Sequence, residues 1–266
     1  MIYTFIPERM GIYHNPKRKS INDIQKEIAA KYQVDIKNVV ICNLNLFNWE
    51  NWTGAAYTRA DHKVVGTDGC GYFGFGFNAD SKKFTRAWSS ENNQANFFGC
   101  NDVIVGGELQ NKPTPIYSAD LKRRTVIGMM KDGKIGIYCN TVPEYPEAMK
   151  RNVLAAGFVE AVNVDGGGST QLICPDGVVV SSDGPAGRAV HTLFWAILVK
   201  PETQKQEPKK QECPYKEPKN YTQTLYGEGA KWMQWQLNRL GAKIDIDGAF
   251  GSKSFAALID VLSTKE

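Results

Sequence analysis

The sequence predicts an α+β fold, in which a body with a mixed sheet and few helices precedes a small all-α C-terminal module. From Val39 onward, short apolar runs alternate with Gly and Asn turns, as is typical of strands. Only two segments of the body have apolar residues at helical spacing. Residues 200–220 are rich in Pro, Lys, Glu and Gln and predict an extended linker, because they bury too little surface to offset their ordering entropy. We therefore divide the chain into a body, 1–199, a linker, 200–220, and a C-terminal module, 221–266.

The first helix of the body is expected to begin after Ser20, which together with Asp23 resembles a capping box. A second helix is expected over 146–156, with a proline in its first turn and Gly157 as its stop signal. A strand, 159–164, follows this helix at once. The buried faces of the two helices would carry Ile21, Ile24 and Ile28 in the first and Met149, Val153 and Ala156 in the second.

Composition argues against several classes of partner. The 32 basic and 28 acidic residues leave a net charge of +4, which is too balanced to indicate a nucleic-acid partner. The N-terminus has neither the charged region nor the apolar run of a signal peptide. No stretch of about 18 apolar residues predicts a membrane span. We therefore expect a protein made in the cytoplasm, with no nucleic acid bound and no membrane span.

Cysteine and histidine spacing indicates neither a metal site nor a thiol enzyme. None of the six cysteines forms a C-x-x-C pair, and no Cys/His cluster has zinc spacing, so we expect buried free thiols rather than disulfides. The histidines are far apart in sequence, and none is a candidate catalytic base. These residues are Cys42, Cys70, Cys100, Cys139, Cys174, Cys213, His14, His62 and His191.

The strongest signal for chemistry is the segment 165–170 (D-G-G-G-S-T), directly after the expected strand 159–164. Three consecutive glycines cost backbone entropy, and they suit a sharp turn or the close approach of a ligand to backbone N–H groups. Consecutive N–H groups in such a loop can form an anion-binding nest. The alternative interpretation is a flexible turn. The segment is not a P-loop, because no lysine follows the glycines.

The segment 161–170 (A-V-N-V-D-G-G-G-S-T) resembles the signature of the phosphodiester glycosidase family, which includes the lysosomal enzyme that removes N-acetylglucosamine from a phosphodiester. Other segments resemble the family in the same order: 41–47 (I-C-N-L-N-L-F), 124–134 (R-T-V-I-G, then K-D-G-K) and 183–199. The resemblance covers residues 39–199 and implies that the body is a catalytic domain.

This sequence departs from the family pattern in segments that are expected to affect substrate specificity, because such loops usually shape the pocket. Leu44 and Asn45 replace a pair of glycines in the early segment. The chain before Arg188 is compressed, and residues 54–100 match the pattern poorly.

Cleavage of a sugar C1–O–phosphate bond explains which residue types the site needs. The reaction passes through an oxocarbenium-like state while negative charge grows on the phosphate. Asp165 is the first candidate for the carboxylate near C1, as nucleophile, base or metal ligand, and Glu108 is the second. Arg124 and Arg188 have the planar charged forks that bind phosphate.

Further binding residues are expected around this centre. No motif demands a cofactor, and a divalent cation such as Ca²⁺ or Mg²⁺ on Asp165 stays an open alternative. The other candidates for substrate or phosphate binding are Asn43, Thr125, Gly166, Gly167, Gly168, Ser169 and Asp183.

The C-terminal module is expected to hold two helices joined by a turn at Asp247 and Gly248. Their buried faces would carry Met233, Leu237 and Leu240, ending at Gly241, and Phe255, Ile259 and Leu262, after a cap at Ser252. The segments 231–238 (K-W-M-Q-W-Q-L-N) and 246–251 (I-D-G-A-F-G) resemble the peptidoglycan-binding domain of bacterial and phage wall hydrolases, whose third helix would be truncated here. The resemblance implies wall binding through Trp232, Trp235, Asp247 and Phe250, with the two tryptophans alternatively in the core.

Together, the two resemblances imply a phage endolysin-like hydrolase that acts on the cell wall after release from the cytoplasm. The expected bond is a sugar-1-phosphodiester, such as the N-acetylglucosamine-1-phosphate link of wall teichoic acid to peptidoglycan. The expected partner is therefore a cell-wall glycopolymer or peptidoglycan. Two alternatives stay open, a non-catalytic wall carbohydrate- or phosphate-binding protein and a peptidoglycan glycosidase. The lack of an H-E-x-x-H motif or a His/Cys pair argues against an amidase or peptidase.

Overall fold

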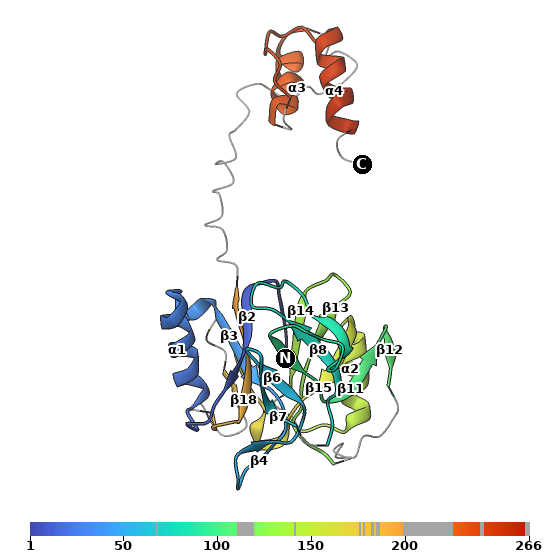
Figure 1. The fold of residues 1–266 in the computed structure, drawn as a ribbon. Coiled ribbons are helices and arrows are strands. Elements are labelled where there is room, and N and C mark those ends of the chain that lie inside the picture. The colour runs from blue at the N-terminus through green and yellow to red at the C-terminus, as the bar shows by residue number, and fades with distance from the viewer. Residues whose placement is uncertain are drawn as a thin grey trace. The chain divides into compact units, whose positions relative to one another are not determined.

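The computed structural model divides the chain into two compact units, Met1–Glu202 and Thr203–Glu266, which are described separately (Figure 1). The body, 1–199, falls within the first unit and the C-terminal module, 221–266, within the second. The residues that the structure describes are 1–67, 69–110, 120–140, 142–175, 177, 179–181, 184, 187–198, 226–239 and 242–263.

The body is built on a five-stranded antiparallel sheet whose strand β3 (Val39–Asn43) is buried along its whole length. Val40 and Cys42 face a central core, while Val39 and Ile41 face the helix α1, because successive side chains of a strand point to opposite faces. The strand order is β17-β16-β3-β18-β2. The other strands are β2 (Pro7–His14), β16 (Gln171–Ile173), β17 (Val179–Ser181) and β18 (Thr192–Leu198).

A six-stranded antiparallel sheet lies on the other side of the central core. Ile127 and Val162 face that core, whereas Val126 and Ala161 face the helix α2. The strand order is β1-β14-β13-β15-β11-β12. The strands are β1 (Ile2–Phe5), β11 (Asn101–Val105), β12 (Glu108–Leu109), β13 (Thr125–Met130), β14 (Ile135–Cys139) and β15 (Phe158–Asn163).

A third sheet, of seven short strands, completes the central core with the buried rings of Phe75, Phe77 and Phe98. Its β5–β7 pair is parallel and its other pairs are antiparallel, so this sheet is mixed. The order is β4-β5-β7-β6-β10-β8-β9. The strands are β4 (Phe47–Asn48), β5 (Thr53–Gly54), β6 (Thr58–Ala60), β7 (Lys63–Gly66), β8 (Phe73–Phe77), β9 (Thr85–Trp88) and β10 (Asn96–Phe98).

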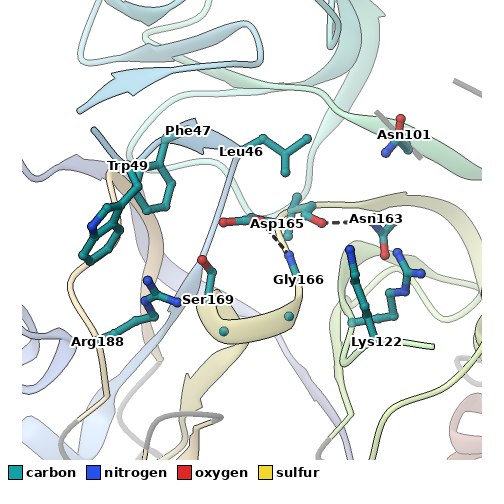
Figure 2. Close-up of a pocket in the computed structure, with 14 residues that line it drawn as sticks. Leu46, Phe47, Trp49, Asn101, Lys122, Asn163, Asp165, Gly166, Ser169 and Arg188 are labelled. Carbon is teal, nitrogen blue, oxygen red and sulfur yellow. Dashed lines mark hydrogen bonds between the residues drawn. The ribbon is translucent and has the colours of Figure 1, made fainter. Parts of the chain in front are cut away.

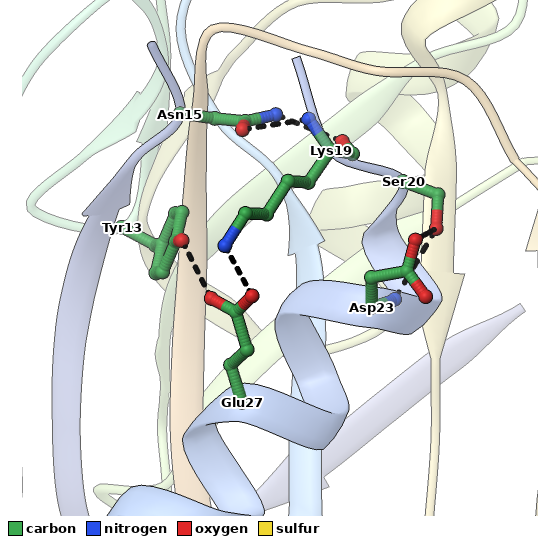
Figure 3. A network of polar contacts seen from close by, with 6 residues as sticks. All are labelled: Tyr13, Asn15, Lys19, Ser20, Asp23 and Glu27. Atoms are coloured by element: carbon green, nitrogen blue, oxygen red, sulfur yellow. Dashed lines mark hydrogen bonds and ion pairs between the residues drawn. The ribbon is translucent and has the colours of Figure 1, made fainter. Parts of the chain in front are cut away.

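Helix α1 (Ile21–Tyr32) begins where the sequence predicts, because the Ser20 side chain accepts the backbone N–H of Asp23 at 3.2 Å. The Tyr13 hydroxyl donates to Glu27 at 2.9 Å, and Lys19 forms an ion pair with the same carboxylate (Figure 3). These bonds connect β2 to the exposed face of the helix. Ile21, Ile24 and Ile28 are buried on its inner face, as expected, and the short 3₁₀ helix η1 (Ile36–Asn38) leads into β3.

Helix α2 (Pro146–Ala155) covers the outer face of the six-stranded sheet. Met149 and Val153 are fully buried there, and Gly157 follows with φ +92°, as the stop signal predicts. The helices α1 and α2 thus lie on opposite sides of the body (Figure 1). The α+β class expected for the body is confirmed, with few helices around mixed and antiparallel sheets.

The C-terminal module contains helices α3 (Glu228–Arg239) and α4 (Ser252–Ser263) around a small core of Ala230, Leu237, Phe250 and Ala257. The buried face expected for the second helix of this module is wrong, because Phe255 is 49% exposed and Ile259 is 63% exposed. The inner face of α4 carries Ala257 and Leu258 instead. The positions expected for Leu240 and Gly241 lie outside the described residues.

Five cysteines are buried free thiols, as the sequence predicts, and Cys213 lies outside the described residues. Among the helices that the structure describes, none combines the length and the apolar character needed to cross a membrane. The five thiols are Cys42, Cys70, Cys100, Cys139 and Cys174.

Candidate active site

The chain crosses from the six-stranded sheet to the five-stranded sheet through residues 164–170, between β15 and β16. The Val164 N–H donates to the Thr125 carbonyl, on β13, at 2.9 Å. The Asp165 N–H donates to the Leu44 carbonyl, just after β3, at 2.8 Å. Because each sheet holds one side of the crossing, the position of Asp165 is determined by both.

Asp165 lies at the centre of a pocket and is half-buried (Figure 2). Its Oδ1 accepts the Gly166 N–H at 2.8 Å. Burial raises the pKa of Asp165 to about 6, while the Ser169 side chain, the Gly166 N–H and the charges of Arg188 and Lys122 act to lower it. A carboxyl group that titrates close to neutral pH is suited to proton transfer or nucleophilic attack.

The pocket has a volume of about 430 Å³, and its lining combines three kinds of chemistry. The apolar wall consists of Leu46, Phe47 and Trp49. Amide side chains of Asn101 and Asn163 line another part, and these two residues are paired across β11 and β15. The cations are Lys122, Arg124 and Arg188. Such a site suits a ligand with both a sugar ring and an anionic group.

The cations come from two segments. Lys122 and Arg124 precede β13, and Arg188 precedes β18. Arg124 is only 4% exposed, and its Nη2 donates to the Asp120 carbonyl at 2.9 Å, which orients the guanidinium. Arg124 and Arg188 therefore converge on the pocket of Asp165, as the sequence hypothesis requires.

The glycine loop lines the pocket, but three of the N–H groups that the sequence suggested as an anion-binding nest already have partners within the protein. The N–H groups of Gly166, Gly167 and Ser169 are already bonded, to the Asp165 carboxylate, the Arg123 carbonyl and the Gly166 carbonyl, respectively. They are therefore not available as phosphate donors. The loop instead turns through the 3₁₀ helix η2 (Gly167–Ser169), where Gly167 has φ +59°.

Gly168 has a different role, which is to allow close contact with Arg188. A Cβ atom on Gly168 would lie 2.2 Å from Arg188 Nη1. The guanidinium therefore occupies the space that a side chain at residue 168 would need. A larger residue at this position would therefore displace the guanidinium end of Arg188.

Asn43 and Thr125 do not line the pocket, contrary to their expected role in substrate binding. Asn43 is fully buried, its Nδ2 donates to the Asp165 carbonyl at 2.7 Å, and its Oδ1 accepts the Gln171 N–H at 3.0 Å. The Thr125 hydroxyl donates to the same Oδ1 at 2.8 Å. Both residues therefore hold the crossing loop from beneath.

Glu108 is not part of the site. It lies on the short strand β12, is exposed, and does not line the pocket. The β11–β12 hairpin presents it to solvent. Asp183, the other expected acid, lies outside the described residues.

The sequence did not identify several of the residues that line the pocket. These residues are Leu46, Phe47, Trp49, Asn101, Lys122 and Asn163. For Asn163 a signal existed, because the period of two in a strand places it on the same face as Asp165. Lys122 belongs to a visible basic cluster, Lys122-Arg123-Arg124. Asn101 becomes a neighbour of Asn163 only through the β11–β15 pairing, which the sequence does not specify.

The donor set of the pocket does not fit a divalent cation on Asp165. Within the described part of the chain, Asp165 is the only carboxylate that lines the pocket, and Lys122, Arg124 and Arg188 line it too. Ca²⁺ and Mg²⁺ favour several oxygen ligands with little competing positive charge. Among the described residues, no group of three or more His, Cys, Asp or Glu side chains is arranged to hold a metal ion.

The residues expected to bind the wall differ in their exposure within the C-terminal module. Phe250 is 5% exposed and belongs to the module's core, so its expected role in binding is wrong. Asp247 accepts bonds from Gln234 Nε2 at 2.7 Å and from the Ala249 N–H at 2.9 Å, which stabilise its turn, and it lines a separate cleft of about 440 Å³. Trp232 and Trp235 are partly buried.

Comparisons with known proteins concern the body of the chain. Residues 36–197 match the family model described as phosphodiester glycosidase. A solved structure of the zebrafish N-acetylglucosamine-1-phosphodiester alpha-N-acetylglucosaminidase catalytic domain, auto-inhibited by pro-peptide, has a TM-score of 0.54 and 17% sequence identity; the match covers 75% of this chain and 83% of that chain. At this identity the likeness shows the fold.

Two other solved structures are more distant. A hypothetical protein from Synechocystis has a TM-score of 0.32 and 11% identity, over 60% of this chain and 34% of that chain. An exported protein from Burkholderia pseudomallei has a TM-score of 0.26 and 25% identity, over 30% of this chain and 16% of that chain. No curated protein matches the chain.

Proposed function

Because the chain belongs to the phosphodiester glycosidase family and is therefore a hydrolase, we propose that it cleaves a sugar-1-phosphodiester bond in a bacterial cell-wall polymer. The observation that carries the proposal is the pocket in which the Asp165 carboxylate lies among three cationic side chains. The substrate we propose is the N-acetylglucosamine-1-phosphate link between wall teichoic acid and peptidoglycan. Its support is the resemblance of segments 231–238 and 246–251 to peptidoglycan-binding domains.

In the proposed reaction the sugar C1–O bond breaks and its electron pair leaves on the phosphate oxygen, while water supplies the hydroxyl group that ends on C1. Arg124, Arg188 and Lys122 stabilise the charge that grows on the phosphate. Ionised Asp165 either bonds C1 or takes a proton from the attacking water. The anomeric configuration of the first-formed sugar separates the two routes, since a covalent intermediate retains it and direct attack by water inverts it.

The test uses purified walls that carry teichoic acid, with walls stripped of teichoic acid in parallel. The wild-type protein should release reducing N-acetylglucosamine ends and phosphomonoesters in equal amounts from the first preparation only. Asp165→Ala should lower the rate by roughly a thousandfold, as loss of a residue at the reacting centre commonly does. Glu108→Gln is the matched carboxylate control and should keep full activity, because Glu108 does not line the pocket.

Equal release by wild type and Asp165→Ala would contradict the proposed site. Release of reducing ends from the stripped walls would instead indicate a peptidoglycan glycosidase. Mass spectrometry of the soluble products identifies the bond that was cut in each case.

We further propose that the C-terminal module directs the enzyme to the wall after a lysis-type release from the cytoplasm. The cleft beside Asp247, formed between the turn and the start of α4, offers polar groups to a glycan or peptide. Binding of the module to walls is measured by sedimentation with the full chain and with the body alone.

A further inference from the structure

Trp49 differs from the other exposed aromatic residues of the body in its position. It is 47% exposed, and it lines the same pocket as Asp165. Trp88 is exposed to a similar degree, at 52%, but it lies on β9 and does not line the pocket. Since single exposed aromatic residues are common, it is the place of Trp49 in the wall of the Asp165 pocket that offers its ring to a ligand.

The hairpin that carries Trp49 is held in one conformation. It connects β4 to β5, and Asn48 Oδ1 accepts the backbone N–H of Glu50 at 2.9 Å. Trp52 adopts φ +57°, and its Nε1 donates to the Asn15 carbonyl at 2.7 Å. Trp52 thereby anchors the hairpin to the residue that directly follows β2. Trp49 packs edge-on against Trp52, with ring centroids 5.4 Å apart, so its ring is presented in a defined orientation.

Trp49 also contacts the cation next to Asp165. The Arg188 guanidinium carbon lies 4.4 Å from the centre of the Trp49 ring, and Arg188 Nη1 occupies the space beside Gly168. The guanidinium is thus held between an aromatic ring and a glycine. In Figure 2, Trp49, Phe47 and Arg188 lie on one side of Asp165, while Lys122, Asn163 and Asn101 lie on the other.

From this arrangement we propose that Trp49 is a sugar-stacking subsite for the unit that the phosphate carries beyond the scissile bond. The inference rests on the proposed function, in which Asp165 faces C1 and Arg188 binds the phosphate. A ring stacked on Trp49 is then attached to that phosphate on its far side. The flat apolar face of a pyranose matches an indole face, whereas an alkyl group or an open-chain polyol does not.

Two soluble diesters of N-acetylglucosamine-1-phosphate test the subsite, one with a methyl group and one with methyl N-acetylglucosaminide on the phosphate. The wild type should prefer the sugar diester. Trp49→Ala should lower kcat/KM for the sugar diester about tenfold, mainly through KM, and for the methyl diester less than about threefold, as expected for loss of one stacked ring. Trp49→Phe should recover part of the loss, and Trp88→Ala, the matched control, should have no effect.

An equal loss on both diesters would show that Trp49 only positions Arg188, and it would overturn the subsite. Calorimetric binding of methyl N-acetylglucosaminide 6-phosphate to wild type and to Trp49→Ala provides a readout that does not require turnover. Binding that weakens about tenfold in the variant supports the subsite, even when neither diester is hydrolysed. Absence of hydrolysis together with this weaker binding would contradict the proposed function but not the subsite. Binding that is unchanged, or undetectable in the wild type, overturns the subsite.

Discussion

The carboxyl group of Asp165 is held where burial and nearby cations act in opposite directions. Burial raises its pKa to about 6, although Ser169, the Gly166 N–H, Arg188 and Lys122 all favour the ionised form. The result is a carboxylate that is ionised at neutral pH but only weakly solvated. Such a group is more reactive towards an electron-poor carbon or a water proton than a surface aspartate.

The pH dependence of activity should follow this group. Because the proposed role needs ionised Asp165, kcat/KM should rise tenfold per pH unit below about pH 6 and reach a plateau above it. Steady-state kinetics with the methyl diester between pH 4.5 and 8 measures the profile. A rate that instead falls as the pH rises through 6 would assign Asp165 as a general acid.

The same pKa predicts an effect on stability. The folded pKa of about 6 lies above the ordinary value, so the contribution of Asp165 is most favourable at low pH and is lost as the pH rises through 6. Asp165→Asn should therefore unfold at a temperature roughly 2–5 °C higher than wild type at pH 7.5. The difference should shrink below about pH 4, where the wild-type carboxyl is protonated. Scanning calorimetry at the two pH values measures it.

Gly168 determines where the charge of Arg188 lies. In Gly168→Ala the new Cβ would displace Arg188 Nη1, which is the flexible end of a side chain. We expect kcat/KM to fall by roughly 10–100-fold, as for loss of one oriented charged donor, with little change in the unfolding temperature. An unchanged kcat/KM would show that the position of Arg188 is unimportant for the reaction.

At the scale of elements, the end of β3 supports the crossing loop. Asn43 connects three segments, since it donates to the Asp165 carbonyl and accepts from the Thr125 hydroxyl and the Gln171 N–H. A buried amide with these partners fixes the relative position of β3, β13 and the start of β16. The catalytic aspartate of the proposed mechanism therefore depends on an asparagine that does not line the pocket.

Two substitutions should show how much the hydrogen bonds of Asn43 contribute to the free energy of unfolding. Thr125→Val removes one buried hydrogen bond and should cost about 1 kcal/mol of unfolding free energy, whereas Asn43→Ala removes three and should cost about 2–4 kcal/mol. Urea unfolding of the two variants measures the difference. Equal costs would mean that the bonds to Asp165 and Gln171 contribute nothing.

The elements themselves were largely predictable. The caps and apolar spacing of α1 and α2 are local, and the structure confirms their starts. In α4 the same reasoning selected the wrong face, because Phe255 and Ile259 are exposed and Ala257 is buried. A helix with apolar residues on more than one side does not specify which side packs, and the small core of the module decides it.

At the scale of the whole molecule, the body and the C-terminal module have separate hydrophobic cores. A chain truncated after Glu202 should therefore unfold at the same temperature as the body in the full chain, within about 2 °C. It should keep its kcat/KM on the soluble diesters and lose sedimentation with walls. Thermal unfolding, kinetics and wall sedimentation of both chains check this. Undiminished sedimentation of the truncated chain would place wall binding in the body.

The sequence by itself determined the α+β class of the body, the helix starts and the loop 165–170, because caps, periodicity and glycine runs are local properties of the chain. It also identified Asp165, Arg124 and Arg188, which the fold brings to one pocket. Only the tertiary structure decided that Asn43 and Thr125 lie beneath the site and that Glu108 lies outside it. It also decided that the N–H groups of Gly166, Gly167 and Ser169 are already bonded. The aromatic wall with Trp49 also depends on tertiary structure. All these features depend on how the strands pair and on which hydrogen-bond donors have acceptors in the other sheet. Strand pairing and hydrogen bonding between sheets are set by contacts between segments far apart in the sequence.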